Sequence, residues 1–211
     1  MTRVPLVIQL KGRKVLVAGA GPVGLRRARA LSRAGARVTV VAPRMGGRLP
    51  KGCRLLRRRF RSSDAAGCLL VVAATSDRIQ NDRIAARARA SGSLVNLTSA
   101  SEASEVWFPA VVRRGSLMIA VSTGSSAPAV ARRIQKELAR AYGPAYGLYL
   151  RLLDEARRSV KLRVREAPIR RSVLRRLASP DLFRLCQTRG GRVARREMWR
   201  IAGSPSARGQ G

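Results

Sequence analysis

The chain has 211 residues, of which 45% are hydrophobic and only 4% aromatic, so its core must consist mainly of aliphatic side chains. Its 44 basic and 11 acidic residues give a net charge of +33, which attracts anionic ligands. The chain contains no histidine, which excludes imidazole chemistry, and its three cysteines show neither a zinc-site spacing nor a disulfide framework. The charge is spread along the chain and aromatic residues are scarce, so we do not expect nucleic acid as a specific partner.

Apolar runs alternate with amphipathic segments over the first hundred residues. Strands are predicted at residues 14–18, 38–42, 68–74 and 94–97, with an edge strand at 55–60. Helices are predicted over residues 24–35 and 81–90, each closed by a glycine. This order predicts an α/β domain built on a Rossmann-type, doubly wound parallel sheet.

The pattern changes after residue 100. Two strands are expected around the sequence Arg113-Arg114-Gly115, followed by a helix over residues 128–142. The segment from residue 146 to residue 200 has helical periodicity interrupted at Pro168 and Pro180, and the final residues are expected to be disordered. No apolar run is long enough to span a membrane and no signal peptide is recognisable, so we expect a cytoplasmic protein.

The sequence GAGPVG lies between the first strand and the first helix and has the GxGxxG spacing of dinucleotide-binding proteins. Gly19 allows the tight turn, Gly21 lets the backbone approach a pyrophosphate, and Gly24 lets the helix pack closely on the strand. Pro22 and Val23 begin the helix, whose N-terminus favours phosphate. We therefore expect a dinucleotide at this turn.

The acidic residue that holds the ribose of NAD in many such domains is missing after the second strand, where this chain has Pro43 and Arg44. An arginine at this place favours NADP, because a cation pairs with the 2′-phosphate. In so basic a chain, Arg44 is equally compatible with an ordinary surface arginine. The residues by themselves leave NAD and NADP open.

Four stretches in the same order resemble the precorrin-2 dehydrogenase and sirohydrochlorin ferrochelatase family, the amino-terminal module of siroheme synthases. They are VPLVIQLKGRKVLVAGAG, ARVTVVAP, VVAATSDRIQN and FPAVVRRGSLMIAVSTGSSAPAVARRIQKEL. The resemblance covers residues 4–142. It implies an NAD-binding Rossmann domain (1–105), a dimerisation and substrate-cleft segment (106–145) and a helical C-terminal domain (146–211), in a homodimer.

The same resemblance implies a function. Family members oxidise precorrin-2 to sirohydrochlorin with NAD, and some also insert Fe²⁺ as a substrate. The family carries proline after its second strand and uses NAD, which favours NAD here. It also implies that the dinucleotide is flanked by Pro22, Val23, Pro43 and Arg44 and that Thr75 lies near it. The tetrapyrrole cleft is implied to be lined by Thr123, Gly124 and Ser125. An anionic tetrapyrrole with eight carboxylates suits a strongly basic protein.

One family position differs. Family members carry a catalytic aspartate after the strand that corresponds to residues 94–97, whereas this chain carries Ser99. A serine does not accept a proton as a carboxylate does unless a base activates it, and the chain has no histidine to do so. Glu102 and Glu105 follow in the same loop and are candidate substitutes. We expect dehydrogenation to survive, because it depends on positioning, and we regard the ferrochelatase activity as doubtful.

Two other readings stay open. A family member could bind tetrapyrrole or nucleotide without catalysis, as a carrier or regulator. Alternatively, the chain could be a diverged Rossmann oxidoreductase or a protein associated with nucleic acid. The metal ligands, if any exist, are unknown from the sequence.

Overall fold

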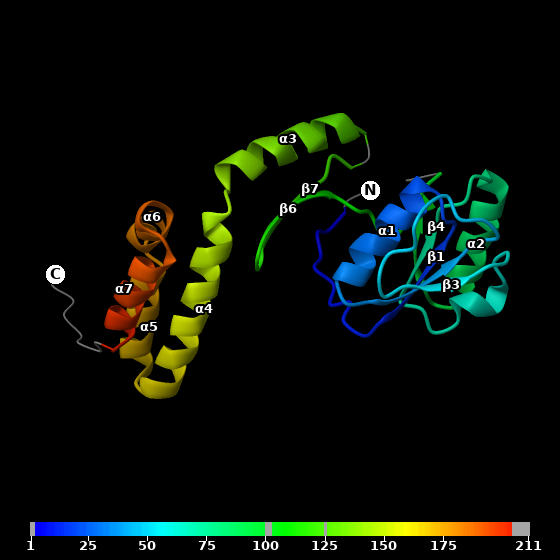
Figure 1. Cartoon of the computed structure of the whole chain (residues 1–211). Coiled ribbons are helices and arrows are strands. Elements are labelled where there is room, and N and C mark those ends of the chain that lie inside the picture. The colour runs from blue at the N-terminus through cyan, green and yellow to red at the C-terminus, as the bar shows by residue number, and fades with distance from the viewer. Residues whose placement is uncertain (1–2, 100–102, 125, 204–211) are drawn as a thin grey trace. The chain divides into compact units, whose positions relative to one another are not determined.

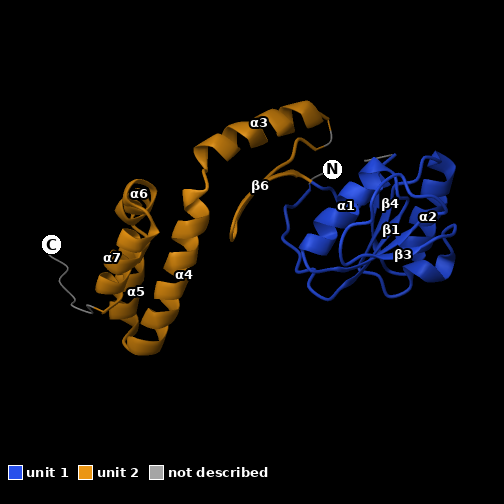
Figure 2. Ribbon diagram, viewed as in Figure 1, with its two compact units in different colours: residues 1–108 blue, residues 109–211 orange. Residues whose placement is uncertain are grey.

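The computed structural model describes residues 3–99, 103–124 and 126–203 (Figure 1). The chain forms two compact units, residues 1–108 and 109–211 (Figure 2). The predicted division into three parts is finer and stays a prediction. The first unit contains β1 (Lys14–Ala18), α1 (Pro22–Arg33), β2 (Arg37–Val41), β3 (Arg54–Leu56), the 3-10 helix η1 (Ser62–Ala65), β4 (Leu70–Ala73), α2 (Arg78–Ala90) and β5 (Leu94–Leu97).

The five strands of this unit form one parallel sheet in the order β3-β2-β1-β4-β5. This confirms the predicted Rossmann-type sheet, including the edge strand, which is shorter than expected. The register aligns Ala18 with Val41 and with Ala73, and Ala73 with Leu97. The carboxyl ends of β1, β2, β4 and β5 therefore lie side by side, and in open parallel sheets this edge is where ligands bind.

The sheet is covered by a helix on each face (Figure 1). Val15 and Val17 of β1 point into the cluster that contains α1, while the alternate residues Leu16 and Ala18 point into the cluster that contains α2. Strand side chains alternate between faces, so a strand buried on both sides must be apolar throughout. Each fully buried valine or leucine contributes roughly 1.5–3 kcal/mol, and this burial holds the turn after β1 in place.

The connection from β2 to β3, residues 42–53, contains no helix or strand. Its start lies beside the turn after β1, because the amide of Gly46 donates to the carbonyl of Ala20 at 3.0 Å. Because parallel crossovers are right-handed, a helix in this connection would cover the α1 side of the sheet, and Met45, Leu49 and Cys53 of the loop pack on that side instead. On the α2 side, the connection from β3 to β4 carries only η1, which leaves the outer part of the sheet open.

The second unit begins with an antiparallel hairpin and continues as helices. Its elements are β6 (Ala110–Arg114), β7 (Leu117–Val121), α3 (Pro128–Ala141), α4 (Ala145–Arg163), α5 (Ala167–Leu177), α6 (Pro180–Arg189) and α7 (Gly191–Gly203). Both predicted strands and the helix after them are confirmed. The hairpin turns at Gly115, whose φ of 60° suits glycine, so the two arginines expected in the turn belong to β6 instead.

Helices α4 to α7 share a core of aliphatic side chains with Tyr149 at one end. Pro168 and Pro180 fall in the first turns of α5 and α6, where proline fits a helix because the first amides lack intrahelical partners. This explains the interruptions in the helical pattern. In the part of the chain that the structure describes, no helix is long and apolar enough to cross a membrane.

Candidate functional site

The turn between β1 and α1 depends on its first and third glycines for steric reasons. Gly19 has a φ of 111°, and a Cβ there would lie 2.2 Å from the carbonyl oxygen of Ala74. A Cβ on Gly24 would lie 2.2 Å from the carbonyl oxygen of Gly19. The backbone of the turn therefore lies directly against the end of β4, and the backbone of α1 lies directly against the turn. Any side chain at either position would force the backbone apart.

The middle glycine differs in kind. Gly21 has an ordinary extended backbone, with φ −74° and ψ 179°, and a Cβ there would have no atom within 4 Å among the described residues. Neither strain nor packing therefore explains this glycine. What it provides is open space against the backbone, which a pyrophosphate needs for close approach.

The first turn of α1 is suited to an anion. Gly21 is its N-cap and supplies no side chain, Pro22 is its first residue, and this turn carries no acidic side chain. Helix N-termini have amides without intrahelical partners and a positive dipole end. With no capping side chain bound to them, these amides remain available for phosphate oxygens.

The loop after β2 adds an exposed cation beside this turn. Pro43 and Arg44 are both exposed, and the contact of Gly46 with Ala20 holds their loop against the glycine turn. Residues 42–50 include no acid. The structure thus places the glycine turn, Pro22 and Val23 beside the loop of Pro43 and Arg44.

Thr75 lies just beyond β4 and is held by Asn81, a residue of α2 whose side chain is buried. The carboxamide oxygen of Asn81 accepts from the amide of Thr75 at 2.9 Å and from its hydroxyl at 2.7 Å. The carboxamide nitrogen donates to the carbonyl of Thr75 at 3.1 Å and to the hydroxyl of Ser99 at 3.5 Å. Asn81 therefore joins the ends of β4 and β5.

Asn81 is the site residue that the sequence reasoning did not single out. It ends the stretch VVAATSDRIQN, which carried part of the family resemblance. A polar side chain at a buried position of a helix was the available signal, since buried amides need partners. Which partners it contacts depends on how β4, α2 and β5 pack together.

The segment after β5 folds back along that strand. The amides of Glu105 and Val106 donate to the carbonyl of Val95, and the amide of Leu97 donates to the hydroxyl of Ser104. These bonds satisfy part of the edge that β5 would otherwise expose. Residues 103–106 are therefore part of the first unit and not a linker.

Glu105 lies away from the carboxyl end of β5. Its carboxylate is paired with Arg89 at 2.5 Å and accepts from the amide of Val95 at 2.9 Å, near the start of the strand. The structure does not bring Glu105 to Ser99, so the geometry does not favour it as a substitute base. Glu102 falls outside the described residues. Ser99 itself is exposed at the end of the strand.

The residues expected to line the tetrapyrrole cleft belong to the second unit. Gly124 has a φ of 64° and its amide donates to the hydroxyl of Ser122, while Ser126 donates to the carbonyl of Thr123 at 2.6 Å. Ser125 lies outside the described residues. Helix α3 starts from Ala127 with no side-chain cap. These residues belong to the second unit, and the glycine turn belongs to the first.

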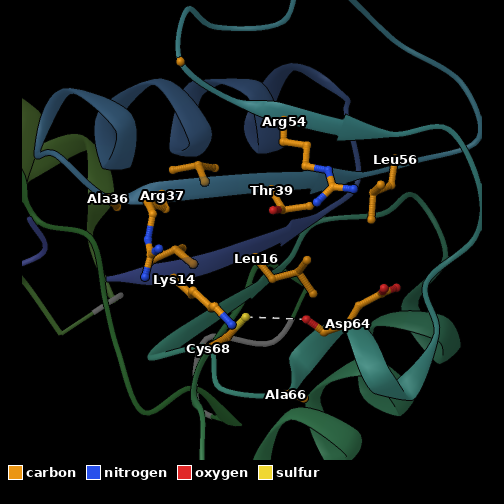
Figure 3. A pocket seen from close by; sticks show the side chains of 13 residues that line it. Lys14, Leu16, Ala36, Arg37, Thr39, Arg54, Leu56, Asp64, Ala66 and Cys68 are labelled. Carbon is orange, nitrogen blue, oxygen red and sulfur yellow. Dashed lines mark hydrogen bonds between the residues drawn. The ribbon is translucent and has the colours of Figure 1, made fainter. Parts of the chain in front are cut away.

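A cavity of about 460 Å³ lies over the amino halves of β1 and β2 and over β3 (Figure 3). Its basic side chains are Lys14, Arg37 and Arg54, and its one acid, Asp64, is paired with Arg58 at 2.6 Å. Basic residues make up three of its thirteen lining residues, against 44 of 211 in the whole chain. The lining is thus about as rich in basic residues as the whole chain, and it includes no residue of the glycine turn.

The described residues contain no group of three or more histidine, cysteine, aspartate or glutamate side chains able to hold a metal ion. The chemistry available at the carboxyl edge of the sheet, among the described residues, is that of backbone amides, hydroxyls, the carboxamide of Asn81, the cation of Arg44 and the carboxylate of Asp77, which caps α2. Such groups bind and orient a ligand, but none of them is a strong base at neutral pH.

The parallel order of the sheet, the packed glycines at positions 19 and 24 and the open space at Gly21 define a Rossmann protein that binds a dinucleotide. The family NAD_binding_7, described as "Putative NAD(P)-binding", matches residues 6–110. The matches below support the resemblance to the precorrin-2 dehydrogenase family that the four sequence stretches indicated.

Several siroheme synthases are similar to this chain. That of Pseudomonas entomophila (strain L48) is 41% identical over 166 residues, which are 74% of this chain and 36% of that protein. That of Ectopseudomonas mendocina (strain ymp) is 43% identical over 164 residues, 76% of this chain and 36% of that protein. The chain thus spans little more than a third of the length of these relatives.

A solved structure titled "SirC, precorrin-2 dehydrogenase" resembles the whole chain. It superposes with a TM-score of 0.75 and 25% sequence identity, covering 94% of this chain and 100% of that one. The likeness therefore extends past the Rossmann unit into the hairpin and the helices.

Proposed function

We propose that this chain is an NAD-dependent precorrin-2 dehydrogenase, which oxidises precorrin-2 to sirohydrochlorin in siroheme synthesis. The observation that carries the proposal is the glycine turn, in which Gly19 and Gly24 are required by packing while Gly21 leaves space for a ligand. The family match and the structural likeness to a precorrin-2 dehydrogenase support the particular reaction that we propose.

The residues present fit the cofactor. We assign the pyrophosphate to the backbone around Gly21 and the first turn of α1 at Pro22 and Val23, and the ribose side to the loop of Pro43 and Arg44. Thr75 would flank the nicotinamide half, at the end of β4. When bound, the cofactor supplies a hydride acceptor. NAD is favoured over NADP because the family pairs proline at this loop with NAD, although the exposed Arg44 would tolerate a 2′-phosphate.

The reaction requires little acid–base help from the protein. Oxidation removes a hydride and a proton from precorrin-2; the hydride yields NADH and the proton passes to water. Rate enhancement then comes from holding the two reactants in register, which well-oriented binding groups can provide. Ser99, just beyond β5 and bonded to Asn81 of α2, is suited to orienting a ligand rather than to accepting its proton.

Metal insertion is expected to be weak or absent. The family aspartate is replaced by Ser99, Glu105 is paired with Arg89, and the residues that the structure describes form no acidic cluster. Of the two glutamates considered from the sequence, Glu102 remains the candidate for handling a proton or Fe²⁺. Iron would enter as a substrate and not as a resident cofactor.

The proposal includes a homodimer and a cleft for the tetrapyrrole at Thr123, Gly124 and Ser125. Supporting the dimer, β7 has no fully buried residue and α3 buries only Ala131, although α3 has a pronounced apolar face. Apolar strands and helices that find no cover within their own chain are typical of subunit interfaces. The free thiols of all three cysteines agree with a cytoplasmic location.

The decisive experiment is to incubate the purified protein with precorrin-2 and NAD, recording the visible spectrum and the absorbance of NADH. The proposal expects the sirohydrochlorin spectrum and an equal amount of NADH, with a slower reaction when NADP replaces NAD. No change in either signal would refute it. A repeat with Fe²⁺ or Co²⁺ tests metal insertion.

The replacement of the family acid by Ser99 favours one second candidate, a protein that binds tetrapyrrole or nucleotide without turning it over. Tight binding of sirohydrochlorin and NADH, with no oxidation of precorrin-2, would select this function over the first.

A further inference from the structure

We infer that Asn81 is a positioning residue that turns the hydroxyl of Ser99 into a hydrogen-bond donor, directed at a carboxylate arm of the tetrapyrrole. The inference rests on the proposed function for the identity of the ligand. Its structural part depends only on the hydrogen bonds around Asn81.

The orientation of the Asn81 carboxamide is fixed by two groups of Thr75 that each allow a single role. The backbone amide of Thr75 only donates, and it lies 2.9 Å from the carboxamide oxygen. The backbone carbonyl of Thr75 only accepts, and it lies 3.1 Å from the carboxamide nitrogen. An inverted carboxamide would set donor against donor and acceptor against acceptor, so only one orientation satisfies both.

With that orientation, the nitrogen of Asn81 has one hydrogen left, and it points to the hydroxyl oxygen of Ser99 at 3.5 Å. The bond is long and therefore individually weak. Its direction still matters, because Ser99 is the acceptor in it. The single hydroxyl hydrogen of Ser99 is then left for another partner, and Ser99 is exposed at the ligand-binding edge of the sheet.

Asn81 is well placed to act on Ser99 without moving itself. Its side chain is buried, with 1% of the residue exposed, and its carboxamide oxygen and both of its amide hydrogens have partners. Buried amides with every partner in place are rigid. Its position in the first turn of α2 is secured by the cap at Asp77, whose side chain accepts from the amide of Gln80 at 3.1 Å.

At residue 99, this chain therefore has a hydrogen-bond donor where the family aspartate provides an acceptor. A carboxylate accepts protons and repels an anionic ligand, whereas an oriented hydroxyl donates and attracts one. A substrate with eight carboxylates offers acceptors for such a donor. This assigns Ser99 to substrate binding and Asn81 to its orientation.

Four variants test the inference: Ser99→Ala, the matched Ser99→Thr, Asn81→Asp, and the double substitution Ser99→Ala with Asn81→Asp. The Asp substitution keeps the shape but replaces the donor to Ser99 by an acceptor, so the hydroxyl turns away from the ligand. The readouts are the KM for precorrin-2, kcat, and the Kd of sirohydrochlorin measured by absorbance without cofactor.

We expect Ser99→Ala and Asn81→Asp each to raise the KM and the Kd about tenfold, as loss of one hydrogen bond to a charged group predicts. Ser99→Thr should retain most of the affinity, because it keeps a hydroxyl. The double variant should be no worse than Asn81→Asp alone, because both changes remove the same contact. Effects that multiply would show that Asn81 acts independently of Ser99 and would overturn the inference.

A nuclear magnetic resonance measurement tests the geometry without turnover. The two side-chain amide protons of Asn81, assigned by their loss in Asn81→Asp, should both be protected from exchange, and Ser99→Ala should shift one of them. No shift would overturn the inference, even if the protein oxidised precorrin-2. A shift in a protein that neither binds nor oxidises tetrapyrrole would uphold the hydrogen bond and refute the assigned ligand and the proposed function. The exposed Ser99 variants keep the test valid if Asn81→Asp fails to fold.

Discussion

The ends of β1 and β5 lie at the same edge of one sheet, yet only the first keeps the family pattern. After β1, all three glycines are present, and two of them are imposed by contacts of 2.2 Å that any Cβ would make. After β5, Ser99 stands in place of the aspartate that the family carries, and it accepts a hydrogen bond from the buried Asn81. We therefore expect dinucleotide binding and proton transfer to depend on separate strand ends, so that one can change while the other is kept.

The largest effect on stability is expected from substitutions in the glycine turn. Gly19→Ala would place a Cβ against the backbone of Ala74 at a φ of 111°, and we expect a loss of stability above about 3 kcal/mol. Gly21→Ala should instead leave the melting temperature almost unchanged and weaken NADH binding more than tenfold. Thermal unfolding and NADH fluorescence titration distinguish the two. Equal destabilisation by both would contradict the assignment of Gly21 to the ligand.

Restoring the family acid tests the end of β5. Ser99→Asp should raise insertion of Co²⁺ into sirohydrochlorin at least about tenfold above the wild-type protein, since a carboxylate accepts the protons that the metal displaces. The measurement is the visible spectrum of the metallated product, with Ser99→Asn as a control of similar shape and no charge. Equal rates of Co²⁺ insertion in both variants would mean that the missing carboxylate does not limit metal insertion.

The acid of the cavity beside β1, Asp64, is paired with Arg58, and we expect it to contribute to stability. Hydrogen bonds from Arg58 and from the amide of Arg61 lower the pKa of Asp64 below its ordinary value. A lowered folded-state pKa adds stability above the unfolded value of about 3.9, and this stability is lost as the pH falls through the folded value.

Asp64→Asn should therefore lower the free energy of unfolding by about 1–3 kcal/mol at pH 7. Urea unfolding at pH 7 and at pH 3 should show a smaller difference from the wild-type protein at the lower pH. A difference that grows on acidification would contradict the direction of the pKa shift.

The smallest effect is expected at Glu105. Its pair with Arg89 is partly exposed, so Glu105→Gln should cost about 1 kcal/mol of stability, measured by urea unfolding. The rate of precorrin-2 oxidation should change less than about twofold, because this carboxylate lies near the start of β5 and not at its end. If Glu105→Gln abolished turnover while Glu102→Gln left it unchanged, Glu105 would again be a candidate for the catalytic base.

Much of the fold could be predicted because its signals are local. Apolar runs bounded by glycines located β1, β2, β4 and β5, and prolines located the starts of α5 and α6. The glycine turn was predicted for the same reason, since its three residues act within one strand–helix junction. The edge strand β3 was predicted too long, because its length depends on pairing with β2 and not on its own residues.

Glu105 and Asn81 could not be placed from the sequence, because their roles depend on contacts between separate elements. Glu105 follows Ser99 closely in the chain, and proximity in sequence suggested proximity in the site. The segment after β5 folds back along the strand, which carries the carboxylate to its far end. Asn81 lies 18 residues before Ser99 and meets it only through the packing of α2 against the sheet.

The sequence by itself determined the parallel sheet, the dinucleotide turn and the loss of the family acid, because each of these is written in the type and spacing of neighbouring residues. The tertiary structure alone decided which polar groups surround the vacated position. A side chain's hydrogen-bonding role is set by the partners that packing brings to it, and packing placed the donor of Asn81 beside Ser99 while it paired Glu105 elsewhere.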